Sequence, residues 1–208
     1  MAKSSVNTPI AAVDSLSPRG RATRDSLLDA ATRVFERVGF LDARVELIAQ
    51  EADVSYGTFY RYFESKEDVF RELSTRLFTD VHLREPSAPD MTPAQRLIAS
   101  NRAYYQAYRR NARMMAIVEQ VATFNAEFRD LRHQHRAQWI ERTASAIARW
   151  QREGRARAGL DPTMAARAMA AMVDHSLYLW LVQGEDADET KLLETLDQMC
   201  LGALGLDG

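Results

Sequence analysis

Glycine and proline, the two residues that most often interrupt helices, are absent from long stretches of this chain of 208 residues. There is no glycine between residues 57 and 154, and no proline between residues 18 and 86 or between residues 93 and 162. Alanine, arginine, leucine, glutamate and methionine, which all favour helices, dominate these stretches. The sequence therefore predicts an all-α protein.

Composition limits the classes of protein that this chain can represent. It carries 27 basic and 29 acidic residues, so any binding to nucleic acid must come from the local placement of charge and not from a basic excess. The single cysteine, Cys200, excludes an internal disulfide and a multi-cysteine zinc site. No stretch has the ~18 apolar residues of a membrane span, and the N-terminus has no apolar signal core. We therefore expect a cytoplasmic protein with no membrane segment.

The pattern of apolar residues and helix breakers predicts about nine helices in two groups. Residues 1–18 are rich in serine, threonine, alanine and proline, and we expect them to be a disordered arm. Residues 19–66 predict a domain of three short helices at about 21–38, 44–52 and 56–62, and residues 67–83 predict a connecting helix. Prolines mark a break near residues 84–92. Residues 92–205 predict five more helices, at about 93–110, 112–121, 125–154, 162–183 and 187–203.

Residues 44–66, RVELIAQEADVSYGTFYRYFESK, contain the most specific pattern. Two short helices around a tight turn at Asp53-Val54 predict a helix-turn-helix, whose second helix would lie in the major groove of DNA. Ser55 is a good N-cap for that helix, and its N-terminus favours phosphate. Gly57 has no side chain and would let the backbone approach DNA closely. We therefore predict that this segment binds DNA.

The same segment resembles the TetR family of transcriptional regulators over about residues 21–75. The matching residues are Ala30-Ala31, Phe35, Gly39-Phe40, Ile48-Ala49, Val54-Ser55, Gly57-Thr58, Tyr60, Tyr62-Phe63 and Ser65-Lys66-Glu67. The later part of the chain is similar to the family in length and helical plan only. The resemblance implies a homodimer that binds a palindromic operator in double-stranded DNA, and a repressor that a small apolar effector releases.

Individual roles in DNA binding follow from this resemblance. It implies phosphate contacts by Ser55, Tyr60 and Lys66. It also implies that base edges are faced by Tyr56, Gly57, Thr58 and Arg61, with Arg44 as a further contact to a phosphate or a base. Lys66 stands at a predicted helix start, where a cation is unfavourable, and a phosphate contact would be one reason for its presence.

Two positions depart from the family pattern. Arg44 stands where the family usually has threonine or serine, so a hydroxyl cap is lost and Asp42 could replace it. Asp53 stands where the family usually has glycine, and aspartate tolerates the left-handed conformation better than most residues.

Several of these side chains also allow plainer interpretations. Tyr62 is expected to pack in the core, and Tyr60 could do so as well. Arg44 and Arg61 could be solvated surface residues. Three arginines near the arm could either extend the DNA contacts or make none, namely Arg19, Arg21 and Arg24.

Residues 93–204 contain many aromatic and methionine side chains, which at helical spacing usually form a core. The resemblance implies instead that some of them line an effector pocket between the middle helices. The candidates are Tyr104, Tyr108, Met115, Phe124, Met172 and His175, of which His175 could also be a satisfied core histidine. The last two helices are the expected dimer interface, because small residues such as Ala168 and Ala171 allow close packing into a four-helix bundle.

Enzyme chemistry has little support in the sequence. His133 and His135 are two residues apart, so they point to different faces of a helix and cannot chelate one metal ion. We predict no catalytic residue, no metal site and no cofactor. Two alternatives stay open: a transcriptional activator of the same fold, and an all-helical small-molecule-binding protein without DNA binding. The second leaves the pattern of residues 55–66 unexplained.

Overall fold

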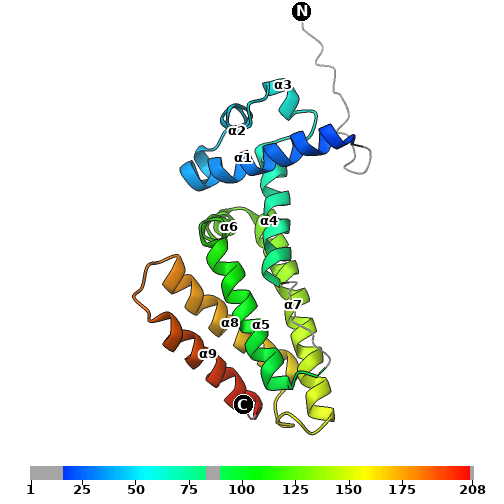
Figure 1. The fold of residues 1–208 in the computed structure, drawn as a ribbon, viewed down its shortest axis with the longest axis vertical. Coiled ribbons are helices and arrows are strands. Elements are labelled where there is room, and N and C mark those ends of the chain that lie inside the picture. The colour runs from blue at the N-terminus through cyan, green and yellow to red at the C-terminus, as the bar shows by residue number, and fades with distance from the viewer. Residues whose placement is uncertain (1–15, 83–89, 207–208) are drawn as a thin grey trace, which may run out of the picture. The chain divides into compact units, whose positions relative to one another are not determined.

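The computed structural model describes residues 16–82 and 90–206, and this part of the chain is all-helical, as the sequence predicts (Figure 1). The predicted arm falls mostly outside the described residues, and so does most of the predicted break near residues 84–92. The described helices are α1 (Pro18–Asp42), α2 (Val45–Glu51), α3 (Tyr56–Phe59), α4 (Lys66–His82), α5 (Pro93–Arg110), α6 (Ala112–Phe124), α7 (Ala126–Arg152), α8 (Pro162–Leu181) and α9 (Glu189–Leu204).

The chain divides into two compact units, with the boundary between Arg76 and Leu77. This boundary falls inside α4, so one continuous helix contributes residues to both units. We call the part up to Arg76 the head and the part from Leu77 onward the body.

The head is built from α1, α2, α3 and the first part of α4. Helix α1 begins at Pro18, three residues earlier than predicted, because the Ser17 side chain accepts a hydrogen bond from the Gly20 N–H. Gly39 interrupts α1 with φ of 76°, which is the helix break that the sequence predicts. The core of the head consists of fully buried side chains from all four helices, among them Leu27, Phe35, Ile48, Phe59 and Phe70.

The body contains α5 to α9. The longest helix, α7, packs against α6 and α8, while α5 packs against α6, α8 and α9. Polar caps fix where these helices begin: Thr92 and Gln95 form a reciprocal capping box at α5, and Asp161 and Asp188 cap α8 and α9. In the body, the predicted helix boundaries agree with the structure within about three residues, and the largest difference is at the end of α6, which is predicted at residue 121 and lies at Phe124.

Candidate nucleic-acid interface and ligand cavity

The turn between α2 and α3 has the backbone conformation that the helix-turn-helix requires. Asp53 has φ of 52°, in the left-handed region, and the Val54 N–H donates to the Ala49 carbonyl oxygen at 3.0 Å. Aspartate is one of the few residues other than glycine that adopts this conformation at modest cost. The departure at Asp53 therefore leaves the turn intact.

Ser55 caps the recognition helix α3. Its Oγ accepts from the Thr58 N–H at 3.1 Å and lies 2.8 Å from Thr58 Oγ1. The regular helix ends at Phe59, three residues before the predicted end at residue 62. After Phe59 the chain continues in turns, in which the Arg61 N–H donates to the Thr58 carbonyl oxygen and the Phe63 N–H donates to the Phe59 carbonyl oxygen.

The predicted DNA-contacting side chains of α3 lie on the surface of the head. Ser55, Tyr56, Gly57, Tyr60 and Arg61 are exposed, and Thr58 is half-buried. Tyr56 and Tyr60 form a pair in which the hydroxyl oxygens are 2.9 Å apart, and this hydrogen bond raises the pKa of Tyr60 to about 12. Tyr62 is buried in the core, as expected. The turn therefore presents hydroxyl groups, backbone and one guanidinium to solvent.

Gly57 is not required by the fold of the head. A Cβ built on Gly57 would meet only Ser55 Oγ, at 4.0 Å, and its φ lies outside the left-handed region. The absence of a side chain therefore has no explanation within the head itself, whereas an outside surface in close contact would explain it.

Arg44 occupies the N-cap position of α2 and is exposed. No side chain caps this helix, so the expectation that Asp42 replaces the lost hydroxyl is wrong. The Arg44 side chain is not used as a cap and is available on the surface.

Lys66 makes contacts within the head that the sequence did not predict, and its phosphate contact stays a prediction. Its Nζ donates to the carbonyl oxygens of Phe40, Leu41 and Ala43 at 2.8, 3.1 and 2.9 Å, and it lies 4.8 Å from the centre of the Phe40 ring. An ammonium group has three donors, so these bonds use all of them. Lys66 therefore binds the carbonyl groups at the end of α1, which lack helical partners.

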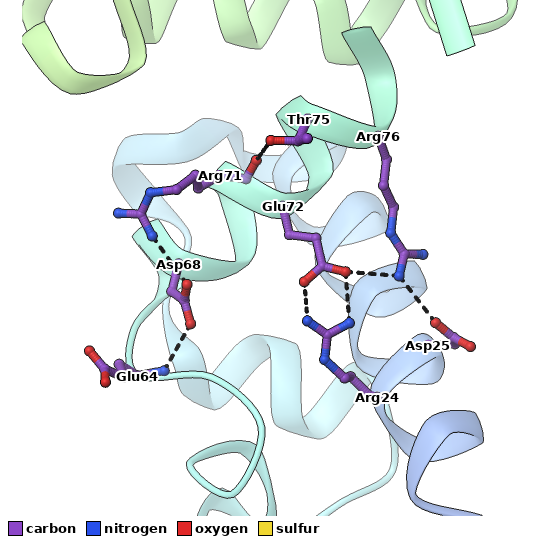
Figure 2. Close-up of polar contacts among 8 residues, drawn as sticks. All are labelled: Arg24, Asp25, Glu64, Asp68, Arg71, Glu72, Thr75 and Arg76. Carbon is purple, nitrogen blue, oxygen red and sulfur yellow. Dashed lines mark hydrogen bonds and ion pairs between the residues drawn. The ribbon is translucent and has the colours of Figure 1, made fainter. Parts of the chain in front are cut away.

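Arg24 is also turned inward and is buried in the head. Its guanidinium makes a bidentate pair with Glu72 and lies 4.8 Å from the centre of the Phe63 ring. Figure 2 shows how Arg76 joins the group, donating to Glu72 and to Asp25. This cluster ties α1 to α4 and to the residue that follows the recognition turn. The sequence offers only one signal for it, a charged residue within the buried stripe of α1.

A cavity of about 110 Å³ lies within the body. Its apolar walls come from α4 to α8 and include Phe78, Leu97, Met115, Trp139, Ile147, Trp150, Met169 and Val173. Polar and charged side chains also line it, namely Arg96, Ser100, Asn101, Tyr104, Glu119, Arg132, Arg136, Thr143, Arg149 and Asp174. The described residues thus contain a cavity that combines apolar walls with a wall of polar and charged groups, and such a cavity suits a small molecule that has both kinds of group.

Only part of the predicted pocket is at this cavity. Tyr104 and Met115 line it. Tyr108 is buried without lining it, and Phe124 is 51% exposed near the end of α6. Met172 is half-buried and His175 is exposed on α8, where Met169, Ala170 and Val173 face inward instead. The helical period places Met172 and His175 on the outer face of α8, which hydrophobicity alone could not distinguish from the inner one.

A charged network forms one wall of the cavity. The Tyr104 hydroxyl donates to Asp174 Oδ1 at 2.6 Å, and Arg136 Nη1 donates to Oδ2 at 3.3 Å. Arg132 donates to Glu119 at 2.6 Å and has a nitrogen 3.8 Å from Asp174. Burial, followed by the charge of Asp174, raises the pKa of Tyr104 well above its usual value, so Tyr104 remains a donor.

Helix-turn-helix head and cavity-bearing helical body together define a ligand-responsive DNA-binding regulator. Residues 27–73 match the family described as "Bacterial regulatory proteins, tetR family", and residues 88–204 match "Transcriptional regulator EthR, C-terminal domain". The chain belongs to the TetR family of transcriptional regulators.

Relatives and solved structures agree with this assignment. The Bacillus subtilis protein "Uncharacterized HTH-type transcriptional regulator YdgC" is 26% identical over 89% of this chain and 95% of its own length. The fold is also that of the fatty acid degradation regulator FadR from Bacillus halodurans, with a TM-score of 0.72 and 24% identity over 92% of this chain and 99% of that one. SmeT, the repressor of the Stenotrophomonas maltophilia multidrug efflux pump SmeDEF, has the same TM-score and identity over 89% and 91%.

Two negative observations apply to residues 16–82 and 90–206. No group of three or more histidine, cysteine, aspartate or glutamate side chains is placed to hold a metal ion there. Within the same ranges no helix is long and apolar enough to cross a membrane.

Replacing Lys66 with methionine keeps the apolar stem and removes the three hydrogen bonds. We expect the head to lose about 1.5–3 kcal/mol of stability or more, because hydrogen bonds to a charged group are worth about that much each. We expect the salt dependence of DNA binding to keep its slope. Thermal melts and binding titrations at several salt concentrations measure both effects, with Lys191→Met, an exposed lysine on α9, as the control. A slope lower by about one unit in a normally stable variant would instead indicate a phosphate contact.

Proposed function

We propose that this regulator is a repressor that binds a palindromic operator as a homodimer and leaves it when a small molecule enters the cavity of the body. It acts in the cytoplasm and catalyses no reaction. Ser55, Tyr56, Gly57, Thr58, Tyr60 and Arg61, together with Arg44, contact DNA, whereas Lys66 and Arg24 stabilise the head. The observation that carries this assignment is the exposed, capped recognition turn around a glycine that the fold itself does not need.

The outer faces of α8 and α9 support dimerisation through these two helices. On α8, Met164 is 62% exposed, and Ala168, Ala171 and His175 are exposed at helical spacing on the same side. On α9, Met199 is 55% exposed. Small and apolar residues on two adjacent helices suit a four-helix bundle between two subunits. A two-fold dimer then requires two half-sites, about one DNA turn or ~34–36 Å apart.

Helix α4 offers a route from the cavity to the head. Phe78 of α4 lines the cavity, and Glu72, about one and a half turns earlier on the same helix, holds Arg24. A ligand that displaces Phe78 would therefore act on the helix to which the head is fastened. A coupling of about 1–3 kcal/mol would change operator affinity by roughly 5–150-fold.

Gly57→Ala tests the DNA-contacting surface. We expect a stable protein, because a methyl group has open space in the head and alanine favours helices by about 1 kcal/mol over glycine. We expect operator affinity to fall tenfold or more, about 1.4 kcal/mol, because the methyl group would stand between the backbone and DNA. Fluorescence anisotropy with DNA from upstream of the protein's own gene measures this. Gly159→Ala, which also adds a methyl group in open space, serves as the control.

Wild-type affinity in Gly57→Ala would contradict the close approach of the turn to DNA. The wild-type protein should bind upstream DNA more tightly than unrelated DNA. If it does not, the alternative of a small-molecule-binding protein without DNA binding is favoured. Transcription in vitro from a bound promoter then separates repressor from activator, since the protein should lower the yield of transcript.

Ala171→Arg tests the dimer. The wild-type chain should have the mass of two subunits in light scattering at micromolar concentration, and the variant should be a monomer, because two arginines would meet near the two-fold axis. Ala137→Arg, an exposed alanine on α7, should remain a dimer. A monomeric wild-type protein would contradict the proposal, and so would a dimer that Ala171→Arg leaves intact.

A further inference from the structure

More arginine than carboxylate side chains line the cavity of the body, and one of these arginines, Arg149, also pairs with Glu153. Four basic residues line the cavity, Arg96, Arg132, Arg136 and Arg149, against two acidic ones, Glu119 and Asp174. A guest with a positive charge would meet repulsion from these guanidinium groups, whereas a guest with a negative charge would be attracted.

Asp174 supplies the negative charge at the centre of this wall. Its two carboxylate oxygens face three donors from two other helices: Tyr104 of α5, and Arg132 and Arg136 of α7. The side chains of Arg132, Arg136 and Asp174 are between 21% and 29% exposed, so they lie at the edge of a space that a ligand could enter.

The two arginines hold Asp174 loosely. Charge-assisted hydrogen bonds from nitrogen to a carboxylate usually measure about 2.7–2.9 Å. Arg136 is 3.3 Å from Asp174, and Arg132 is 3.8 Å from it, although Arg132 binds Glu119 closely at 2.6 Å. A guanidinium has five N–H donors in a fork that suits a carboxylate in two-point contact. A carboxylate free to adjust its position could therefore bind these groups better than Asp174, whose position on α8 is fixed.

We propose that the effector is an amphipathic carboxylate, whose acidic group takes the place of Asp174 on Arg132 and Arg136 while its apolar part lies against the walls of the cavity. Asp174 thus binds the same guanidinium groups that the carboxylate of the effector would bind. This inference rests on the proposed function, in which the cavity is the effector site, and it replaces the simpler expectation of a purely apolar effector.

The size of the cavity determines which probe to use. A volume of about 110 Å³ is below the ~150 Å³ of an engineered cavity that binds benzene, so an eight-carbon chain enters only if lining side chains move, and a longer chain needs a larger movement. Met115 and Met169 line the space, and methionine side chains adapt readily to a guest.

Three eight-carbon probes show which head group the cavity binds best: octanoate, octan-1-ol and octylamine. Trp139 and Trp150 line the cavity and would report binding by fluorescence. Trp180 stacks on Tyr105 instead, and Trp180→Phe would remove its background signal while keeping an aromatic ring. At neutral pH we expect octanoate to bind at least tenfold more tightly than octan-1-ol and octylamine.

Variants test the displacement of Asp174. Arg136→Gln should weaken octanoate tenfold or more without changing octan-1-ol. Asp174→Asn should tighten octanoate several-fold, because it removes the competing carboxylate. Arg129→Gln removes an exposed arginine from the same helix and should change neither. Circular dichroism and thermal melts identify variants that fail to fold. Arg136→Lys, which keeps the charge but loses the fork, should then show an intermediate loss.

Equal binding of octanoate and octan-1-ol would overturn the proposal, as would tighter binding of octylamine or no binding of octanoate up to millimolar concentration. Weaker octanoate binding in Asp174→Asn would also overturn it, because the carboxylate would then support the site and not compete for it. None of these assays contains DNA. A chain that still binds its operator but fails them would retain the proposed function and lose only this assignment of ligand class.

Discussion

The contact of Arg24 with Glu72 constrains how the parts of the DNA-binding head meet, because neither charge can be buried there without the other at low cost. It places a buried guanidinium between α1, α4 and the Phe63 ring just after the recognition turn. Lys66 stabilises the head at the other end of α1, where it donates hydrogen bonds to three carbonyl groups. Two cations on a DNA-binding unit are thus used to hold its shape, and the proposed contacts with DNA fall to Arg44 and to the exposed side chains around α3.

In the head, Arg24 joins α1 with α4, whereas arginine side chains of the body line a cavity. Its cavity has apolar walls, which favour the entry of an apolar chain, and a wall of arginine and carboxylate groups that lie in contact with one another. Paired charges of this kind contribute little net stability, because desolvation offsets most of their attraction. Their position beside a ligand-sized space is more readily explained by recognition of a ligand than by folding.

Features set by neighbouring residues could be predicted from the sequence. The Ser55 cap, the Thr92 capping box, the break at Gly39 and the left-handed turn at Asp53 all follow from local chemistry. The resemblance to a family correctly identified the class of protein. The roles of Lys66 and Arg24 could not be predicted, because a long cationic side chain reaches inward or outward according to partners 23 to 48 residues away. The position of His175 on the exposed face of α8 could not be predicted for a related reason, since the inner and outer faces of this helix are both apolar.

The most direct test of this account is a double-mutant cycle on Arg24 and Glu72, read by thermal unfolding and by the salt dependence of operator binding. Glu72→Met should destabilise the head by about 3–5 kcal/mol, because it leaves the buried Arg24 guanidinium without its partner. Arg24→Met should cost less, because Glu72 keeps its hydrogen bond from Arg76. The double variant should regain a large part of that loss, and every variant that folds should keep the wild-type salt slope. Independent, additive losses, together with a slope lower by about one unit in Arg24→Met, would show instead that Arg24 contacts DNA.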